Sequence, residues 1–341
     1  MSKWLKVTII AVSSILALIL ALIGTVAILN HRGKFEFHKN DANITNSSVT
    51  TEEDGIVYKK SKYRLNPDVI SFLLIGVDKG ELKSDYSIGL NGQADTLLVG
   101  AVNTKTKSMS IIPISRETLV DVNHYSTSGE YVGVVNEQIC LAYNYGKDIK
   151  QCSRNVLLSV SRALYGINIS SYITMDLTAL EKLSNSVGYI EVAVNEDYYD
   201  ADSRTRYKAG QTIKVKGKSA VYYIHWRTDD VNANNFRMER QKNFITAFMN
   251  KAGNEISTDY SKIITYYNLM QPYVSTNISL SQTTYLATNC MRMNLGDAIE
   301  FESIPGETFI KDGYSAFTPD EDALTDIVIR TFYEKIPEKS Q

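Results

Sequence analysis

Three short runs of almost uninterrupted apolar residues open the folded part of the chain: Val69–Asp78, Thr96–Val102 and Met109–Ile114. A strand covered on one face alternates apolar and polar residues, whereas a strand covered on both faces is apolar throughout. The three runs therefore predict central strands of a buried sheet. Shorter apolar runs predict further strands at Tyr172–Leu177, Tyr189–Val194 and Glu300–Ile304.

Segments with helical periodicity separate these strands. Ser153–Tyr165 carries an apolar stripe and is followed by Gly166, a common helix stop. Strands that alternate with helices indicate an α/β fold, here a three-layer α/β/α sandwich with a central mixed sheet in one domain. The other helices are expected at Glu137–Tyr145, Ala179–Val187, Lys218–Trp226, Arg237–Lys251 and Ala323–Tyr333.

The N-terminus differs from the rest of the chain. Val7–Leu29 contains no charged residue, and at about 1.5 Å per residue a helix of this length would be roughly 35 Å long, enough to span a bilayer. The stretch exceeds the apolar core of a cleaved signal peptide, and no convincing cleavage site follows it. We therefore expect a transmembrane signal anchor over residues 1–30.

Residues 31–66 are polar and weakly patterned, which predicts an extracellular tether, and residues 67–337 form the predicted catalytic domain. Basic residues flank both ends of the apolar stretch, so charge alone does not set the orientation. The large polar C-terminal region with no second span favours a single-pass protein of the cell membrane whose domain lies outside the cell.

Composition narrows the classes of partner. The chain has 341 residues and a net charge of −2, so it offers no broad positive surface for nucleic acid. Its three cysteines are too few for a disulfide framework, and no Cys/His spacing suggests zinc. Cys140 and Cys152 are close enough in sequence to form one bridge outside the cell, but the sequence does not decide whether they do.

Two carboxylates lie at predicted strand ends. Asp78 ends the first apolar run, and Asp95 precedes the second after a glycine-containing loop. Ligand-binding groups collect at strand ends in α/β sheets, and Mg²⁺ binds through one or two carboxylates together with phosphates and water. The pair therefore suggests a metal site, with turn capping as the ordinary alternative.

A dense group of arginines lies between residues 227 and 241. Arg237, Arg240 and Gln241 are spaced i, i+3 and i+4, close to one face of a predicted helix. Guanidinium groups match phosphate oxygens, so the group predicts a site for a multiply charged anion such as pyrophosphate. The alternative is a solvated helix face whose arginines pair with Asp229 and Glu239. Arg116 follows the third apolar run and has no basic neighbour in sequence. We take it as a site residue only if the fold places it close to the arginines between residues 227 and 241.

These segments, in this order, resemble the LytR-CpsA-Psr family of Gram-positive cell envelopes. The resemblance covers about Val69–Lys251. Each motif is weak alone, but their order and spacing behind an N-terminal span make the resemblance specific. The segments that carry it are Leu74–Asp78, Gln93–Thr96, Ile114–Thr118, Ala209–Arg227 and Arg237–Gln241.

The resemblance implies a phosphotransferase. Such proteins move a glycopolymer (teichoic acid, or a capsular or secondary wall polysaccharide) from polyprenyl pyrophosphate to peptidoglycan, with Mg²⁺ or Mn²⁺ and with a pyrophosphatase side activity. It implies a lipid tunnel between sheet and helices, a catalytic set of Asp78, Asp95 and Arg116, and metal ligation by Asp78 and Asp95. Asp78 is also the candidate general base, with a metal-bound hydroxide as the alternative. The pyrophosphate would be bound by Arg116, Arg227, Arg237, Arg240, Gln241, His225 and Gln93.

The chain departs from the family pattern at several of these positions. Gln93 and His225 each stand where the family usually has arginine, and Ser115 and Glu117 replace proline and aspartate. Losing two positive charges should weaken the hold on a doubly charged leaving group. The departures therefore leave open a second function, a non-catalytic or weakly active module that binds polyprenyl phosphate during envelope assembly.

Overall fold

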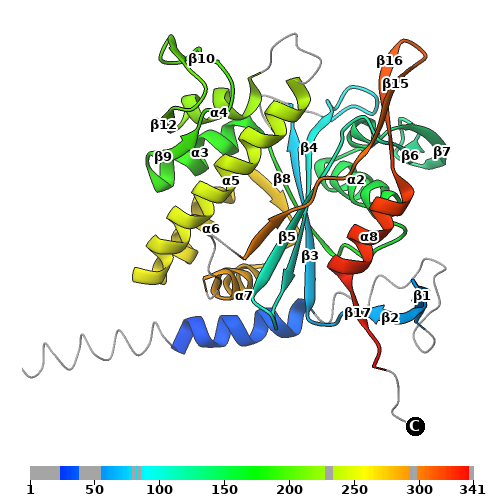
Figure 1. Ribbon diagram of the computed structural model, residues 1–341, viewed down its shortest axis with the longest axis horizontal. Coiled ribbons are helices and arrows are strands. Elements are labelled where there is room, and N and C mark those ends of the chain that lie inside the picture. Colours follow the sequence, from blue (N-terminus) through cyan, green and yellow to red (C-terminus); the bar gives the residue numbers. More distant parts are fainter. Residues whose placement is uncertain are drawn as a thin grey trace, which may run out of the picture.

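A mixed sheet of six strands forms the centre of the molecule (Figure 1). The computed structural model describes residues 24–37, 55–78, 82, 86–226, 233–291, 293 and 298–337. Neighbours in the sheet pair antiparallel except β3–β8 and β5–β14, which are parallel. The predicted central mixed sheet is thus confirmed. Its strands, in spatial order, are β13 (Val274–Thr276), β8 (Ser171–Met175), β3 (Val69–Val77), β4 (Ala94–Asn103), β5 (Ser108–Ile114) and β14 (Ile299–Phe301).

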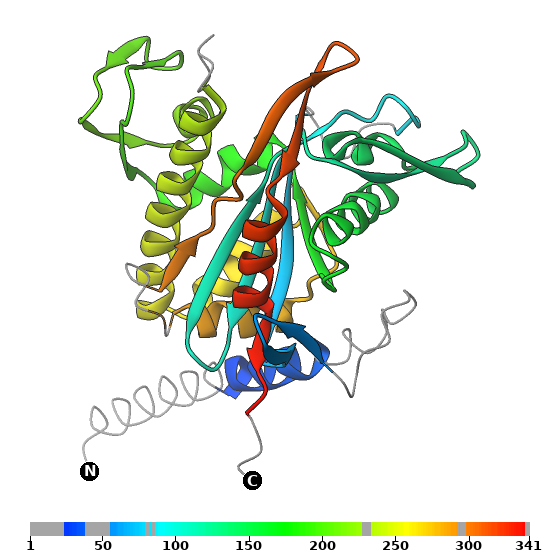
Figure 2. The same cartoon turned by 45° about the vertical axis from the view of Figure 1, so that its right-hand side comes forward.

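Helices cover both faces of this sheet, which gives the predicted three layers (Figures 1 and 2). On one face lie a 3₁₀ helix (Ile139–Asn144), α2 (Ile149–Ala163) and α8 (Glu321–Phe332). The other face is covered by α3 (Leu177–Val187), α4 (Lys218–His225), α5 (Ala233–Thr258), α6 (Ser261–Met270) and α7 (Leu280–Cys290).

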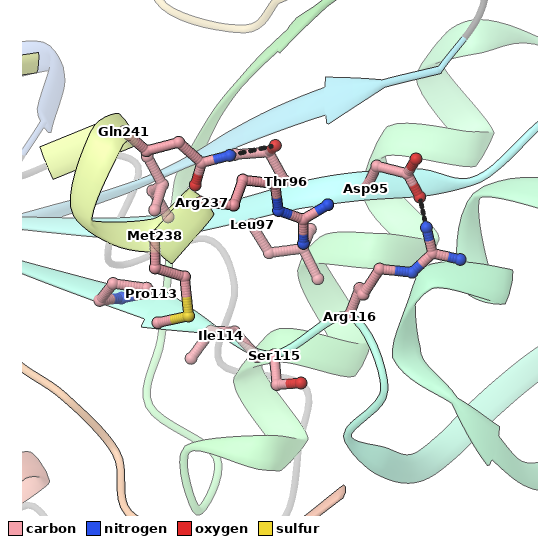
Figure 3. Close-up of a pocket in the computed structure, with 11 residues that line it drawn as sticks. Asp95, Thr96, Leu97, Pro113, Ile114, Ser115, Arg116, Arg237, Met238 and Gln241 are labelled. Atoms are coloured by element: carbon pink, nitrogen blue, oxygen red, sulfur yellow. Dashed lines mark hydrogen bonds and ion pairs between the residues drawn. The ribbon is translucent and has the colours of Figure 1, made fainter. Parts of the chain in front are cut away.

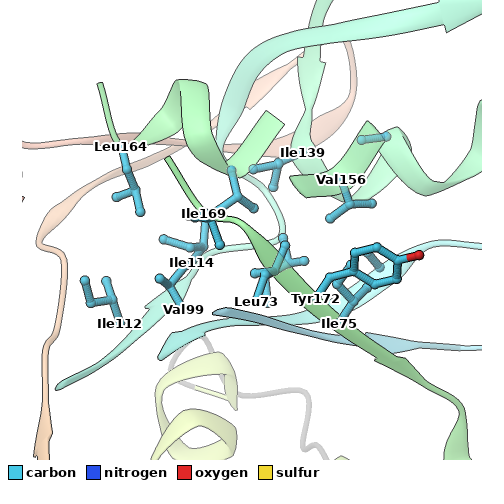
Figure 4. Close-up of a cluster of buried hydrophobic side chains, with 14 of the residues drawn as sticks. Leu73, Ile75, Val99, Ile112, Ile114, Ile139, Val156, Leu164, Ile169 and Tyr172 are labelled. Carbon is cyan, nitrogen blue, oxygen red and sulfur yellow. The ribbon is translucent and has the colours of Figure 1, made fainter. Parts of the chain in front are cut away.

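The apolar runs reflect burial on both faces. Because side chains alternate along a strand, Leu73 and Ile75 of β3 point toward α2, where they pack with Val156 (Figure 4). Phe72 and Leu74 point to the opposite face, in the cluster that contains residues of α5 and α7. Both sets must be apolar, so the strand carries no polar face.

Smaller sheets surround the sandwich. β6 and β7 form a hairpin, as do β15 and β16, and β9 pairs with β12. Their bounds, with those of the β10–β11 pair, are Leu119–Tyr125 (β6), Tyr131–Gln138 (β7), Ile190–Ala193 (β9), Tyr198–Asp200 (β10), Thr205–Tyr207 (β11), Thr212–Val215 (β12), Gly306–Lys311 (β15) and Tyr314–Pro319 (β16).

Local capping and pairing shift several predicted boundaries. The predicted helix Glu137–Tyr145 is wrong in its first residues, because Glu137 and Gln138 pair with β6 as the end of β7. α2 begins four residues early, at Ile149, because the Asp148 carboxylate accepts a hydrogen bond from the Gln151 N–H at 2.8 Å. Asp176 caps α3 in the same way, which ends the preceding strand at Met175.

Part of the predicted tether is folded. β1 (Ile56–Tyr58) and β2 (Ser61–Leu65) form a small sheet with β17 (Tyr333–Lys335), near the C-terminus. Residues 24–37 form a helix, called helix 24–37 below. The predicted tether at 31–66 therefore differs from the structure in both of its described parts. The described residues give weak sequence signals, because their partners lie far away in the chain.

The predicted span Val7–Leu29 lies outside the described residues up to position 23. Within the described part of the chain, no helix combines the length and apolar character that crossing a membrane requires. All three cysteines are free, so Cys140 and Cys152 are not bridged in this structure.

Replacing Leu73 by alanine should lower the free energy of unfolding by about 2–5 kcal/mol, because the substitution opens a cavity in a closed core. Leu73 is fully buried in the central strand β3. Urea unfolding of the purified chain measures the change. The same substitution at Leu90, which is 83% exposed, is the control and should shift stability by less than about 0.5 kcal/mol. Equal effects at the two positions would contradict this account of the core.

Candidate functional site

The strand pairing at the end of β3 contains an irregularity that organises the site. Gly76 pairs with Thr96 and Val77 pairs with Ala94, so Asp95 is an extra residue in β4. Such a β-bulge turns the extra side chain away from its regular direction. Gly76 suits this position, because a Cβ there would lie 2.9 Å from the Cβ of Thr96. The bulge thus presents Asp95 and Thr96 to different neighbours.

Asp95 forms an ion pair with Arg116, the second residue after β5 (Figure 3). The second terminal nitrogen of Arg116 donates to the Gln93 side-chain oxygen at 2.6 Å. The side chains of Arg116 and Asp95 are 22% and 15% exposed, so the pair is partly screened from water. Two acceptors therefore fix the plane of this guanidinium. The structure thus brings Arg116, Asp95 and Gln93 together.

The thiol of Cys140 lies 4.0 Å from the same Gln93 oxygen. Burial raises the pKa of this thiol to about 11, although the neighbouring Arg116 opposes the shift. A thiol reacts as a nucleophile only when it is deprotonated. Cys140 is therefore neutral at physiological pH and gives the site no nucleophile.

α5 contributes Arg237 and Gln241 from the opposite side. These residues are one turn apart, and the Gln241 amide donates to the Thr96 hydroxyl at 3.5 Å. Figure 3 shows Arg237 reaching between the Gln241–Thr96 and Arg116–Asp95 pairs. Together these side chains line a small pocket, called the polar pocket below: Asp95, Thr96, Leu97, Leu98, Pro113, Ile114, Ser115, Arg116, Arg237, Met238 and Gln241.

Arg240 takes a different direction, although it lies within the same two turns of α5. Its Nε donates to the Tyr223 carbonyl at 2.9 Å, and its terminal nitrogens contact Glu196 and the Trp226 carbonyl. Burial lowers the pKa of this guanidinium to about 10. Arg240 is 1% exposed and does not line the polar pocket, which argues against its predicted pyrophosphate contact. It fastens α5 to the end of α4 instead.

The alternative of a solvated arginine face is wrong. Arg237 and Gln241 are 6% and 8% exposed, and Arg240 is buried more completely. Only Glu239 among the residues 237–241 is exposed. A charge run that merely covers a surface would leave its guanidinium groups in water. Here both arginine side chains are buried instead.

The remaining predicted residues lie around the polar pocket or outside the described chain. Asp78 follows β3, and its N–H donates to the Gln93 carbonyl at 3.3 Å, which places it opposite the strand that carries Asp95. Its side chain is exposed and does not line the pocket. His225 ends α4 and lines a larger cavity instead. Arg227 lies outside the described residues.

A metal site here would use carboxylates. No group of three or more His, Cys, Asp and Glu residues able to hold a metal occurs in the described ranges. Mg²⁺ needs fewer protein ligands, because it keeps several waters and binds substrate phosphates. Asp78, just after β3, and Asp95, in the neighbouring strand β4, are carboxylates and match that donor chemistry. Metal binding by this pair stays a prediction.

A large apolar cavity of about 500 Å³ adjoins the polar pocket. It lies between the sheet and the helices α3–α7, with Phe72 and Leu74 on the sheet side and Phe244 and Phe248 on α5. Thr96, Leu98 and Gln241 line both the cavity and the polar pocket. The two spaces are therefore neighbours that share a wall. An apolar space occurs where the tunnel was expected.

Sequence reasoning missed Thr96, Ser115 and Met238 as lining residues. Thr96 could have been noticed, because it is the polar residue at the start of an apolar strand. Its position opposite Gln241 depends on the bulge, which no sequence pattern revealed. Met238 follows from the helical position beside Arg237 once α5 is placed.

The chain belongs to the LytR_cpsA_psr family, whose model matches residues 35–331. This result confirms the resemblance on which the site prediction was based. Polyisoprenyl-teichoic acid--peptidoglycan teichoic acid transferase TagU of Enterococcus faecalis is 27% identical over 332 residues, which are 95% of this chain and 96% of that protein.

Solved structures agree on the fold. The structure of Bacillus subtilis TagV has a TM-score of 0.62 and 23% sequence identity, and the match covers 78% of this chain and 97% of that one. A structure described as TagT bound to LI-WTA has a TM-score of 0.58 and 18% identity, over 84% and 98% of the two chains. At these identities the likeness concerns the fold alone.

Replacing Arg240 by methionine should destabilise the protein by about 3–5 kcal/mol, because Glu196 would keep a partly buried charge without its partner. Thermal or urea unfolding of the purified chain measures this change. The matched variant is Arg237→Met, in the same helix and also buried. We expect a clearly smaller loss there, because Arg237 faces the polar pocket. If Arg237→Met lowered stability as much as Arg240→Met, the two arginines would not differ in structural role.

Proposed function

We propose that this chain transfers a glycopolymer, such as teichoic acid or a capsular or secondary wall polysaccharide, from a polyprenyl pyrophosphate to peptidoglycan. The observation that carries the proposal is the shared wall between the polar pocket and the apolar cavity. A ligand with a charged head and a long apolar tail matches that arrangement. The names of relatives such as TagU support the choice of polymer and acceptor.

The head of this donor fits the polar pocket by charge. Arg116 and Arg237 approach the pocket from β5 and α5, and Gln241 adds amide donors. Guanidinium groups that are held in place by other contacts lose little freedom on binding a phosphate. Arg116 is held in this way by Asp95 and Gln93. The tail would then lie along Leu98 and Phe244 in the cavity.

The proposed reaction is a displacement at the phosphorus that carries the glycopolymer. A sugar hydroxyl of peptidoglycan forms the new P–O bond, the bridging P–O bond breaks, and polyprenyl phosphate leaves with that electron pair. The hydroxyl loses its proton, and the product is a phosphodiester. Such reactions gain most from positioning and charge neutralisation. Arg116 and Arg237 would neutralise charge on the phosphates.

Asp78 and Asp95 would hold Mg²⁺, or Mn²⁺ in its place, and the bound ion would supply further positive charge for the phosphate oxygens. Water in place of the sugar hydroxyl would turn the same displacement into a pyrophosphatase side reaction. Both statements depend on the proposed binding of the donor in the polar pocket.

The proposed location is the outer face of the cell membrane. The uncharged sequence Val7–Leu29 supports a single span, and the polar domain behind it supports the outside location. Donor lipids of this class are membrane-bound, so a membrane location gives the cavity direct access to them.

A binding module without turnover is the second candidate. Gln93 favours it, because an amide oxygen here occupies a donor of Arg116 and brings no charge of its own. The transferase and the binding module differ in whether the chain cleaves the pyrophosphate of the lipid. Mg²⁺-dependent formation of polyprenyl phosphate from a polyprenyl pyrophosphate by the purified chain would exclude the binding module.

Replacing Asp95 or Arg237 by alanine should lower turnover of the lipid-linked donor by at least about 10²-fold, the usual effect of removing a preorganised charge contact. The measurement is the rate of polyprenyl phosphate formation by the full chain with Mg²⁺. Asp202→Ala and Arg206→Ala, at exposed positions away from the pocket, are the matched controls and should retain full activity. Undiminished turnover in either pocket variant, with a normal melting temperature, would refute the site assignment.

A further inference from the structure

Helix 24–37 is packed against α7 at the base of the domain (Figures 1 and 2). Gly33 allows this close approach, because a Cβ there would lie 2.0 Å from the Ser281 carbonyl oxygen. Phe37 is 1% exposed and clusters with Ile70 and Tyr285. The helix is therefore docked on the folded domain.

Polar contacts fix the same interface. The Thr288 hydroxyl donates to the Asn30 side-chain oxygen at 2.6 Å, and the Ser281 hydroxyl donates to the Glu36 carboxylate at 3.1 Å. Gly33, Phe37 and Asn30 lie on one side of the helix, as their spacing of three and four residues requires. The opposite side faces away from the domain.

The outward side of helix 24–37 combines apolar and basic residues. Ile28 and Phe35 are 62% and 68% exposed. His31 and Arg32 are also exposed and lie three and four residues after Ile28, so all four share one stripe. Basic residues beside large exposed apolar side chains are typical of helices that lie at a membrane surface. Anionic lipid headgroups match the charge of this stripe, and the acyl boundary matches Ile28 and Phe35.

We propose that the part of helix 24–37 from Ile28 to Phe37, where the proposed span leaves the bilayer, lies in the headgroup layer of an anionic membrane and holds the base of the domain at the bilayer surface. The inference rests on the membrane location in the proposed function. The uncharged sequence ends at Leu29, and at about 1.5 Å per residue Phe37 lies no more than roughly 12 Å beyond it. One interfacial layer is about 5–8 Å thick, so Phe37 lies within or just outside this layer. The docked domain therefore meets the bilayer directly.

This placement orients the cavity. One side of α7 contacts helix 24–37, and the other side lines the apolar cavity through Leu286, Ala287 and Cys290. Ile70, at the start of β3, packs on helix 24–37, whereas the polar pocket adjoins the other end of that strand. At about 3.3 Å per residue, the two ends of β3 are roughly 25 Å apart. A lipid tail would enter near the membrane, and its head would be presented on the side of the cell wall.

Lipid-depth quenching on the full chain in nanodiscs tests the proposal. The reporter is an environment-sensitive fluorophore on Phe35→Cys, with Cys290 replaced by alanine because the other two cysteines are buried. Leu90→Cys, 83% exposed near the polar-pocket end, is the reference position. Spin-labelled lipids with the label just below the headgroup should quench the fluorophore at position 35 and leave the one at 90 unchanged. Quenching at 35 should fall when phosphatidylglycerol is replaced by phosphatidylcholine, and when Arg32→Glu is added.

Two variants of helix 24–37 test whether docking matters. Gly33→Leu should displace the helix from Ser281, whereas Gly24→Leu is a matched control, because nothing lies within 4 Å of a Cβ at Gly24. A third fluorophore, on Val57→Cys in β1 at the base of the domain, reports the height of the domain. Its quenching should be lost in Gly33→Leu and retained in Gly24→Leu.

Two results in a chain that copurifies with the nanodisc would overturn the inference and leave the proposed function intact. One is equal quenching of the fluorophores at positions 35 and 90. The other is equal quenching at position 57 with and without Gly33→Leu. Equal quenching at position 35 in the two lipid mixtures would overturn the anionic preference. A chain that does not copurify with the nanodisc would refute the membrane location, and the inference with it.

Discussion

The pairing of β3 with β4 is the constraint on which the site depends. A single extra residue in β4 separates the directions of two consecutive side chains, Asp95 and Thr96. Asp95 pairs with Arg116 beyond β5, and Thr96 accepts a hydrogen bond from Gln241 on α5. The start of one strand is thereby tied to β5 and to a helix of the opposite layer. The bulge lies where these elements converge on one pocket.

The same strand start joins two different environments. Arg237 and Arg116 give the polar pocket positive charge, while the adjoining cavity is lined by side chains such as Phe244 and Leu98. Charged groups beside an apolar cavity are costly to bury unless they are paired. Asp95 and Gln93 offset this cost for Arg116, because they accept hydrogen bonds from its guanidinium group. The arrangement therefore holds guanidinium groups ready beside an apolar space, which is what an amphipathic anionic ligand requires.

Sequence patterns predicted the parts of the fold that rest on local periodicity. The apolar runs located β3, β4 and β5, since strands covered on both faces are apolar throughout. Contacts between distant segments were not predictable, because they leave no periodic signal. β2 is paired with β17 across more than two hundred residues. The sequence predicts a helix from Glu137, whereas the end of β7 pairs with β6, because that pairing leaves no local signal.

The candidate site shows the same division. Spacing alone placed Arg237, Arg240 and Gln241 near one helix face, and all three are buried. Spacing could not show that Arg240 turns to Glu196 and Tyr223, since those partners come from other elements. The approach of Arg116 to Asp95 likewise depends on the ends of two strands meeting. Residue types were therefore predictable from motifs, whereas their partners required the tertiary structure.

A structure of the full chain with a polyprenyl pyrophosphate and Mg²⁺ tests the central claim most directly. The account predicts the tail in the apolar cavity beside Phe244 and Phe248, with the pyrophosphate in the polar pocket between Arg116 and Arg237. A pyrophosphate bound elsewhere, or a tail outside the cavity, would contradict the claim that the shared wall at Thr96 and Gln241 defines one binding site.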